Sequence, residues 1–255
     1  MLQTKLSIHF PAKKYYMVSA MLLLAMYTHA INDRIRIGLM ASPGIAWSNP
    51  VGKDLDKGKP RFGIGYGFVF EYWFAKNYGL ATGLEGSFDG CNIKNRDVFA
   101  WKDTSGNVLK NINEKYGFHY LQIPAYLKLK TNEIKSSKFC VWGQVGLNLA
   151  FTVSARATFS DSIFASNGTD MVLVEKENIF RPKNEVTRSI SNFRSNFFDI
   201  RLGAGAGFEY AFDDKTSLVA GLIYHNGFIN NILDGDVKKE PNLMRMFSLR
   251  VGVLF

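Results

Sequence analysis

An alternation of bulky and small side chains runs from residue 62 to residue 73 and constrains the fold more than any other feature. The even positions are all large and apolar: Phe62, Ile64, Tyr66, Phe68, Phe70 and Tyr72. The odd positions are mostly small, and they include the charged Glu71. Successive side chains of a strand point to opposite faces, so this period of two predicts a β-strand with one bulky apolar face.

The same alternation recurs after residue 30 and predicts eight strands. We expect them at residues 34–47, 62–73, 79–89, 116–130, 138–155, 196–210, 217–228 and 244–255. The connections at 74–78, 131–137 and 211–216 are short, and those at 48–61, 90–115, 156–195 and 229–243 are long. This pattern is typical of outer-membrane barrels. We therefore predict an all-β fold, an eight-stranded antiparallel up-and-down transmembrane β-barrel with short periplasmic turns and long extracellular loops.

An eight-stranded barrel can also be a soluble protein of the lipocalin kind, and the charge distribution separates the two. On the four strands that alternate most cleanly, the glycine-bearing face carries the charges and the opposite face carries none. These charged residues are Glu71, Glu85, Asp89, Asp199, Arg201, Glu209 and Arg250. The interior of such a barrel holds few large side chains, so the bulky face must point outward into lipid.

The same argument predicts the contents of the lumen. Charges in a partly dry interior need partners. The four acids Glu71, Glu85, Asp199 and Glu209 are expected to pair with four cations, Arg36, Lys128, Arg201 and Arg250. A lumen filled in this way would not conduct a substantial flux of solute.

Residues 1–30 have the pattern of a signal peptide. Three lysines and no acidic residue precede an apolar stretch at residues 15–26, and the small Ala30 suits signal peptidase. The alternative is a membrane anchor helix, but the stretch is shorter than the ~20 residues that a span needs. We expect a mature chain that starts near Ile31, an outer-membrane β-barrel domain at residues 31–255, and a location in the cell outer membrane.

The last strand ends in an aromatic residue after alternating apolar positions. These positions are Phe247, Leu249, Val251, Val253 and Phe255. The pattern resembles the C-terminal strand that barrel-assembly machinery recognises in its outer-membrane substrates, which makes that machinery an expected partner. The alternative is an ordinary strand that ends in Phe.

The sequence shows no catalytic, cofactor-binding or metal-ligating constellation. The glycines of residues 203–207 lack the helix and the acid of a dinucleotide-binding unit. His119 and His225 are expected on non-adjacent strands and opposite faces, so no catalytic triad can be argued. Cys91 and Cys140 have no CxxC partner and are expected near opposite ends of the barrel, without a disulfide. We therefore predict that the protein is not an enzyme.

Without the three lysines of residues 1–30, the formal net charge of +9 falls to +6, since 28 basic residues then face 22 acidic ones. Much of this charge lies in predicted loops, and it is too diffuse to indicate nucleic acid binding. Ordinary solvated charge is one interpretation, and contact with lipopolysaccharide phosphate is another.

Aromatic residues near strand ends are expected to form interfacial girdles, with a carbohydrate platform as the alternative. They are Trp47, Trp73, Tyr78, Tyr116, Tyr126 and Tyr210. The connection at 156–195 is unusually apolar. Its residues 171–174 are expected to extend a hairpin above the membrane or to dock against a partner.

The strand at residues 116–130 also carries a family motif. An aromatic residue, an amide, Ile-Pro and a Leu-Lys pair occur at Tyr120, Gln122, Ile123, Pro124, Leu127 and Lys128. This pattern resembles the PorT-like outer-membrane β-barrel family of Bacteroidetes, and residues 143–146, 202–210, 224–227 and 251–255 look like later strands of that family. Pro124 cannot donate to a β-ladder, so it predicts a bulge or a non-bonded position.

The resemblance implies a scaffold or interaction protein of the outer membrane that is accessory to protein secretion of the type IX kind. The implied partners are outer-membrane lipid and lipopolysaccharide, together with components of a secretion system. Two other classes stay open at this point. One is a membrane-barrel enzyme that acts on lipid or peptide, and the other is a narrow channel for small solutes.

Overall fold

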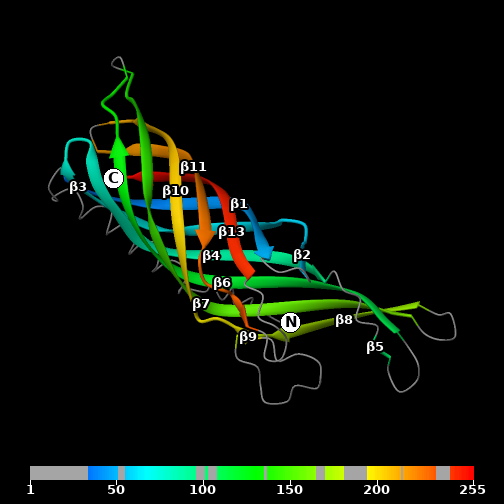
Figure 1. Cartoon of the computed structure of the whole chain (residues 1–255). Coiled ribbons are helices and arrows are strands. Elements are labelled where there is room, and N and C mark those ends of the chain that lie inside the picture. Colours follow the sequence, from blue (N-terminus) through cyan, green and yellow to red (C-terminus); the bar gives the residue numbers. More distant parts are fainter. Residues whose placement is uncertain are drawn as a thin grey trace, which may run out of the picture.

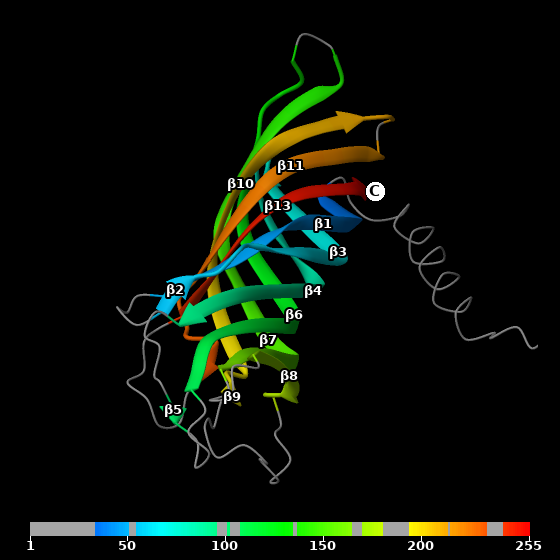
Figure 2. The same cartoon turned by 90° about the vertical axis from the view of Figure 1, so that its right-hand side faces the viewer.

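In the computed structural model, eight long strands wind round a common axis and close into an antiparallel barrel (Figure 1, Figure 2). The structure describes residues 34–50, 55–95, 101–102, 108–134, 137–164, 170–180, 194–213, 215–233 and 242–255. The predicted signal peptide at residues 1–30 lies outside the described residues. Within them, no helix is long and apolar enough to cross a membrane.

All eight predicted strands are confirmed. The barrel strands are β1 (Ile35–Pro50), β3 (Arg61–Ala75), β4 (Tyr78–Asn95), β6 (Val108–Lys130), β7 (Phe139–Phe164), β10 (Phe198–Ala211), β11 (Ser217–Gly227) and β13 (Asn242–Leu254). Each pairs with the next along the chain, and β13 returns to pair with β1, where Ile45 lies opposite Phe247. Closure leaves these strands without a free edge within the barrel wall, as a membrane requires of a β-structure.

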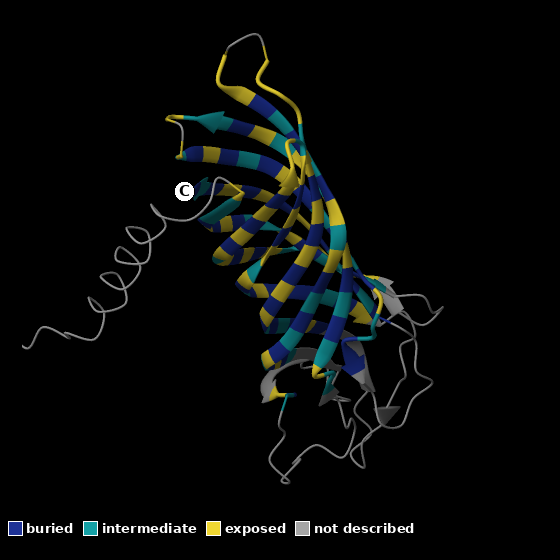
Figure 3. Ribbon diagram, turned by 90° about the vertical axis from the view of Figure 1, so that its left-hand side faces the viewer, coloured by how far each residue is buried: buried dark blue, intermediate teal, exposed yellow. Residues whose placement is uncertain are grey.

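Buried and exposed residues alternate along every barrel strand (Figure 3). The exposed face is apolar: Phe68 on β3 is 40% exposed, Leu147 on β7 is 45% exposed and Leu202 on β10 is 42% exposed. A soluble barrel would bury such residues. The outward direction of the bulky face, as predicted from the charge distribution, is thereby confirmed.

Three neighbouring strands are much longer than a membrane crossing needs. A transmembrane strand takes about 9–11 residues, whereas β4, β6 and β7 have 18, 23 and 26 residues. Their loop ends gain the shorter strands β2 (Leu55–Lys57), β5 (Trp101–Lys102) and β8 (Asp170–Asn178). These strands form an extended sheet that projects from one side of the barrel (Figure 1). A separate pair, β9 (Arg194–Ser195) and β12 (Ile232–Leu233), lies at the same end.

Parts of the long loops predicted at 48–61, 90–115 and 156–195 are therefore strands. Alternation continues on β4 past the end predicted at residue 89, where Cys91 and Ile93 are buried and belong to one cluster with Tyr116 and Phe118 of β6. Because these inward side chains pack together, the ladder between β4 and β6 continues beyond the predicted strand ends. The expectation that residues 171–174 extend a hairpin is confirmed, since they belong to β8, which pairs with β7.

Pro124 lies where the ladder between β4 and β6 is interrupted. Paired positions stop at Thr82 and Ala125 and resume at Glu85 and Gln122 without a change of register. The Thr82 hydroxyl donates to the Pro124 carbonyl at 2.7 Å instead. Of the two alternatives predicted for Pro124, a non-bonded position is the one found.

Candidate functional site: the lumen

The lumen gathers the charged residues that the alternation assigned to the inside. All seven predicted lumenal charges are at most 6% exposed. With Arg36, Lys128 and Lys130 they form three levels of ion pairs from the short-turn end to the loop end. The four acids and four cations predicted to supply these pairs all take part in them.

The level nearest the short turns is rich in cations. Glu209 on β10 pairs with Arg36 of β1 at 2.8 Å and with Lys130 of β6 at 2.9 Å. Glu71 on β3 pairs with Lys128 and accepts from the indole of Trp73 at 3.2 Å. The two carboxylates thus hold three basic side chains across this end of the barrel.

The middle level is a pair between β13 and β4. Nη2 of Arg250 donates to both carboxylate oxygens of Glu85, at 2.9 Å each. The Tyr126 hydroxyl and Nε2 of His225 share a hydrogen bond of 2.9 Å nearby in the lumen. His225 therefore bonds to a phenol rather than to an acid or a serine.

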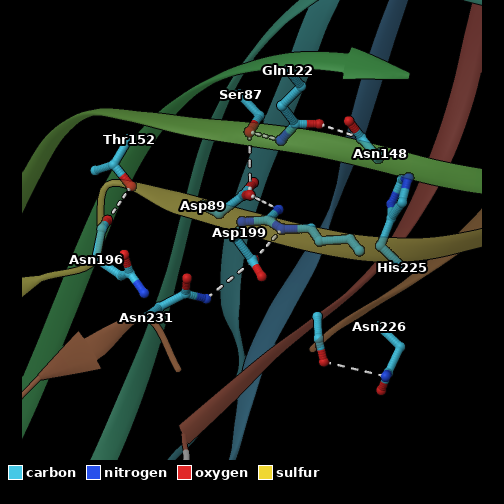
Figure 4. Close-up of polar contacts among 12 residues, drawn as sticks. Ser87, Asp89, Gln122, Asn148, Thr152, Asn196, Asp199, His225, Asn226 and Asn231 are labelled. Atoms are coloured by element: carbon cyan, nitrogen blue, oxygen red, sulfur yellow. Dashed lines mark hydrogen bonds and ion pairs between the residues drawn. The ribbon is translucent and has the colours of Figure 1, made fainter. Parts of the chain in front are cut away.

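The level nearest the loop end centres on Arg201, whose partners Asp89 and Asp199 are labelled in Figure 4. This guanidinium donates to Asp89 of β4 at 2.8 Å and to Asp199 of its own strand at 2.7 Å. It also lies over the Tyr120 ring, 4.3 Å from its centroid. The arrangement places one cation between two carboxylates that are almost fully buried.

Amides and a hydroxyl complete this level (Figure 4). Ser87 donates to Asp89 at 3.2 Å, Gln122 donates to Ser87 at 2.6 Å and Asn148 donates to Gln122 at 2.6 Å. The chain of hydrogen bonds links β4, β6 and β7, so the polar side chains hold one another in fixed positions.

Three of these ion pairs cross the lumen. Going round the barrel, three strand steps separate β1 from β10, β4 from β13 and β4 from β10. The pairs Arg36 with Glu209, Arg250 with Glu85 and Arg201 with Asp89 therefore connect opposite walls.

Apolar clusters fill the lumen above and below the middle. The loop-end cluster comprises Ala46, Cys91, Ile93, Tyr116, Phe118, Tyr120, Ala150, Ala155, Ala157, Ile179, Ile232, Met244 and Met246. The turn-end cluster comprises Met40, Val69, Trp142, Val219, Ile223 and Leu254. Glycines make room for Trp142, since a Cβ at Gly207 would lie 2.8 Å from its Cζ2.

The two histidines and two cysteines lie as predicted. His119 stacks on the outward Phe88, with ring centroids 4.2 Å apart, whereas His225 is buried in the lumen. Cys91 belongs to the loop-end cluster and Cys140 lies near the short turns, and both are free. Among the described residues, no group of three or more His, Cys, Asp or Glu could hold a metal ion.

The girdle prediction is half wrong. Tyr78 is 50% exposed, Tyr210 packs on Phe139 with centroids 4.7 Å apart, and Trp47 lies beside Tyr224, so these three fit an outer girdle.

Trp73, Tyr116 and Tyr126 instead are buried, at 8%, 0% and 2% exposure. Trp73 has the strand parity of Glu71, and Tyr126 has that of Lys128, so both point into the lumen. Face parity, rather than aromatic character, decides where they go.

A closed eight-stranded barrel with a lipid-facing apolar surface and a charged lumen defines a transmembrane β-barrel of an outer membrane. A family model for the outer membrane protein β-barrel domain matches residues 14–233. The chain belongs to this family, and its place is the outer membrane. None of the curated proteins compared with the chain matches it in sequence.

Several solved structures resemble the fold. Neisserial surface protein A has 14% identity, with 86% of this chain and 95% of that chain covered and a TM-score of 0.36. Ail of Yersinia pestis, bound to a heparin analogue, has 11% identity, coverage of 87% and 99% and a TM-score of 0.35. The outer membrane protease OmpT of Escherichia coli has 8% identity, coverage of 89% and 99% and a TM-score of 0.34.

Proposed function

We propose that the protein is a closed, non-enzymatic scaffold of the outer membrane that presents its extended sheet to a partner outside the cell. The observation that carries this proposal is the set of ion pairs that cross the lumen at three levels. Ion pairs that join opposite walls occupy the lumen, so they favour a support rather than a channel.

The extended sheet supplies the surface for interaction. The pairing of β7 with β10 ends at Phe151. From there β7 continues to Phe164 and pairs with β8 instead. At about 3.4 Å per residue this part of β7 is roughly 40 Å long, and its first residues, including Ala155 and Ala157, still contribute to the loop-end cluster of the lumen. Short turns lie at the periplasmic end of outer-membrane barrels, which directs the extension outward.

The partner that we propose is a component of a protein-secretion system of the type IX kind, with this chain as a PorT-like accessory. Support comes from the motif at residues 120–128, which lies on β6 with its inward Gln122 and Lys128 both built into the lumenal network. The proposal of a non-enzymatic role rests on the same network, because the charged groups there are held by one another.

Lipid contacts and assembly belong to the same proposal. Lys115 on β6 and Arg156 on β7 are exposed just above the apolar band, where they suit lipopolysaccharide phosphate. On β13, Phe247, Leu249 and Val251 are 40%, 46% and 37% exposed, which suits recognition by barrel-assembly machinery. We further propose that residues 1–30 are cleaved, which N-terminal sequencing of the mature protein tests.

Crosslinking tests the partner. A photoreactive residue at the exposed Asn178, at the end of β8, should capture a secretion component in native membranes. The same residue at Lys215, in a short turn, is the matched control and should not. Capture of the same component at both sites, or of no secretion component at either site, contradicts a specific role for the extended sheet.

Conductance tests the closed lumen. The purified barrel in a planar bilayer should show no steady channel, because ion pairs at three levels and two apolar clusters occupy its lumen. A wild-type barrel that conducts steadily contradicts the scaffold and favours the small-solute channel.

A further inference from the structure

The short-turn end of the barrel holds a cavity that none of the proposed roles uses. It has a volume of about 340 Å³ and is lined by Arg34, Arg36, Trp73, Phe74, Ala75, Lys76 and Lys130. We term it the basic vestibule. Four of its seven lining residues are cations, and none is an acid.

The charges around the basic vestibule do not balance. Behind it, Glu71 and Glu209 are already shared among Arg36, Lys128 and Lys130, which leaves one positive charge over. Arg34 and Lys76 are exposed and form no ion pair with any residue that the structure describes. The vestibule therefore carries an excess of three positive charges, which attracts an anion.

Two backbone hydrogen bonds position the segments that carry the cations. The Trp73 amide donates to the Arg34 carbonyl at 2.7 Å, which pins the start of β1 against β3. The Lys130 amide donates to the Asn77 carbonyl at 3.0 Å, which pins the turn after Lys76 against β6. Both contacts are part of the β-structure at this end, so the Cα atoms of the basic residues have defined positions.

Trp73 forms a wall of the vestibule and positions one of the amines. Nζ of Lys130 lies 5.6 Å from the centroid of the Trp73 indole while it donates to Glu209. An amine held between a ring and a carboxylate keeps a defined place. It can add a third contact to an anion that Arg34 and Lys76 attract.

The vestibule opens at the rim of the lipid-facing surface. Phe74 lines it and is 48% exposed, and the neighbouring outward residues Tyr72 and Tyr78 are 39% and 50% exposed. Aromatic residues of this kind mark the height of lipid headgroups. We infer that the basic vestibule binds a phosphate group at the periplasmic face, carried by an anionic phospholipid or free in solution.

The chemistry fits phosphate in particular. A guanidinium and two amines supply several charge-assisted donors to one tetrahedral group. The cavity has room for a headgroup phosphate beside the Trp73 wall. Because the charge excess is fixed by the sequence of the rim, affinity should fall steeply with salt.

Binding can be measured on the intact barrel in detergent by native mass spectrometry. The probes are phosphatidylglycerol, phosphatidylcholine and inorganic phosphate. The test variant is Arg34→Gln with Lys76→Gln. The control is Lys59→Gln with Lys215→Gln, which removes the same charge from exposed positions outside the vestibule. All four side chains are exposed, so both variants should fold, which an unchanged gel shift of the unboiled barrel verifies.

We expect the wild type to prefer phosphatidylglycerol to phosphatidylcholine. The Arg34 and Lys76 variant should lose roughly 30-fold in affinity, since each basic residue near an anionic lipid contributes about fivefold. The control should bind like the wild type. Inorganic phosphate bound as tightly as the lipid identifies a soluble source, and phosphate bound only as lipid identifies the membrane. Equal losses in both variants, or no binding of either phosphate probe, overturn the inference.

Discussion

Arg201 is the residue on which the loop-end level of the lumen depends most. Its guanidinium pairs with Asp89 and Asp199, which are 5% and 0% exposed. Replacing Arg201 with Leu leaves two buried carboxylates without their cation. We expect the barrel to lose ~3–5 kcal/mol of stability, the typical cost of breaking a buried pair, measured as a lower urea midpoint for loss of the gel shift.

A matched control separates this effect from the loss of any arginine. Arg156 lies on the outer face of β7 and is exposed. Arg156→Leu should change the stability by about 0.5 kcal/mol or less, as is usual for surface positions. Equal midpoints for the two variants would show that Arg201 is solvated.

Asp213 provides a pH-dependent contact at the short-turn end. Its carboxylate accepts from the amides of Lys215 at 2.9 Å and Thr216 at 2.6 Å. The Lys215 bond, followed by the Thr216 bond, lowers the pKa of this carboxyl below its ordinary value. A lowered folded-state pKa means that the stabilisation is present above the unfolded-state pKa and is lost as pH falls through the folded-state pKa.

We therefore expect the Asp213 carboxyl to titrate below a free aspartate when followed by carboxyl carbon chemical shifts. Asp213→Asn should make the backbone signals of Lys215 and Thr216 insensitive to acid. A carboxyl that titrates at the ordinary value would mean that the two amide bonds are not formed in solution.

Individual lumenal residues were more predictable than their partners. The face of Glu85, Asp199 and Arg250 followed from alternation alone, because a strand has only two faces. Alternation also places Trp73 and Tyr126 on the inward face, whereas their aromatic character predicted an outer girdle. No local pattern could have shown that Arg250 meets Glu85, which is 165 positions away in sequence. That contact depends on the stagger of the closed barrel, a property of all its strands.

At the scale of elements, strand ends were less predictable than strands. The start of β7 was expected at Lys138, but Lys138 has a φ of 59°, in the left-handed region, and belongs to the turn. The far end of β7 was expected at residue 155 and lies at Phe164. A bulge between His119 and Tyr120 breaks the alternation there, with Val153 as the extra residue opposite. After the bulge, the inward residues of β7 fall on odd instead of even positions. A rule that requires an unbroken period of two therefore ends the strand too early.

The length of β7 makes a prediction about the membrane boundary. Leu147 and Thr158 both lie on its outer face, but only Leu147 should meet hydrocarbon. Leu147→Lys should cost ~2–4 kcal/mol in a bilayer, because a lysine near the midplane is poorly solvated. Thr158→Lys, on the same strand and face, should cost little. Unfolding from lipid vesicles in urea measures both, and equal costs would mean that the apolar band extends along the whole of β7.

At the scale of the whole molecule, the two ends of the barrel differ, and the strands that carry the ion pairs of the lumen also cause that difference. The same long strands that carry Glu85, Asp89 and Lys128 inward also extend beyond the barrel at one end only. The other end has short turns and the basic vestibule. Orientation in the membrane therefore decides which of the two surfaces meets the cell exterior.

Labelling with an impermeant maleimide tests that orientation. Single cysteines at Lys94 and Asn178 represent the loop end, and single cysteines at Asn77 and Lys215 represent the turn end. The background must lack Cys91 and Cys140, which are free thiols in the native chain. On intact cells we expect the loop-end sites to react and the turn-end sites to stay unlabelled, because short turns are periplasmic.

Opening the outer membrane should expose the turn-end sites to the same reagent. This second step is the control that separates a shielded site from an unreactive one, since three of the four positions are exposed side chains and Asn77 is half-buried. If the turn-end sites react on intact cells while the loop-end sites do not, the barrel is inverted. The extended sheet would then face the periplasm and the basic vestibule would face the exterior, where the headgroup phosphates belong to lipopolysaccharide.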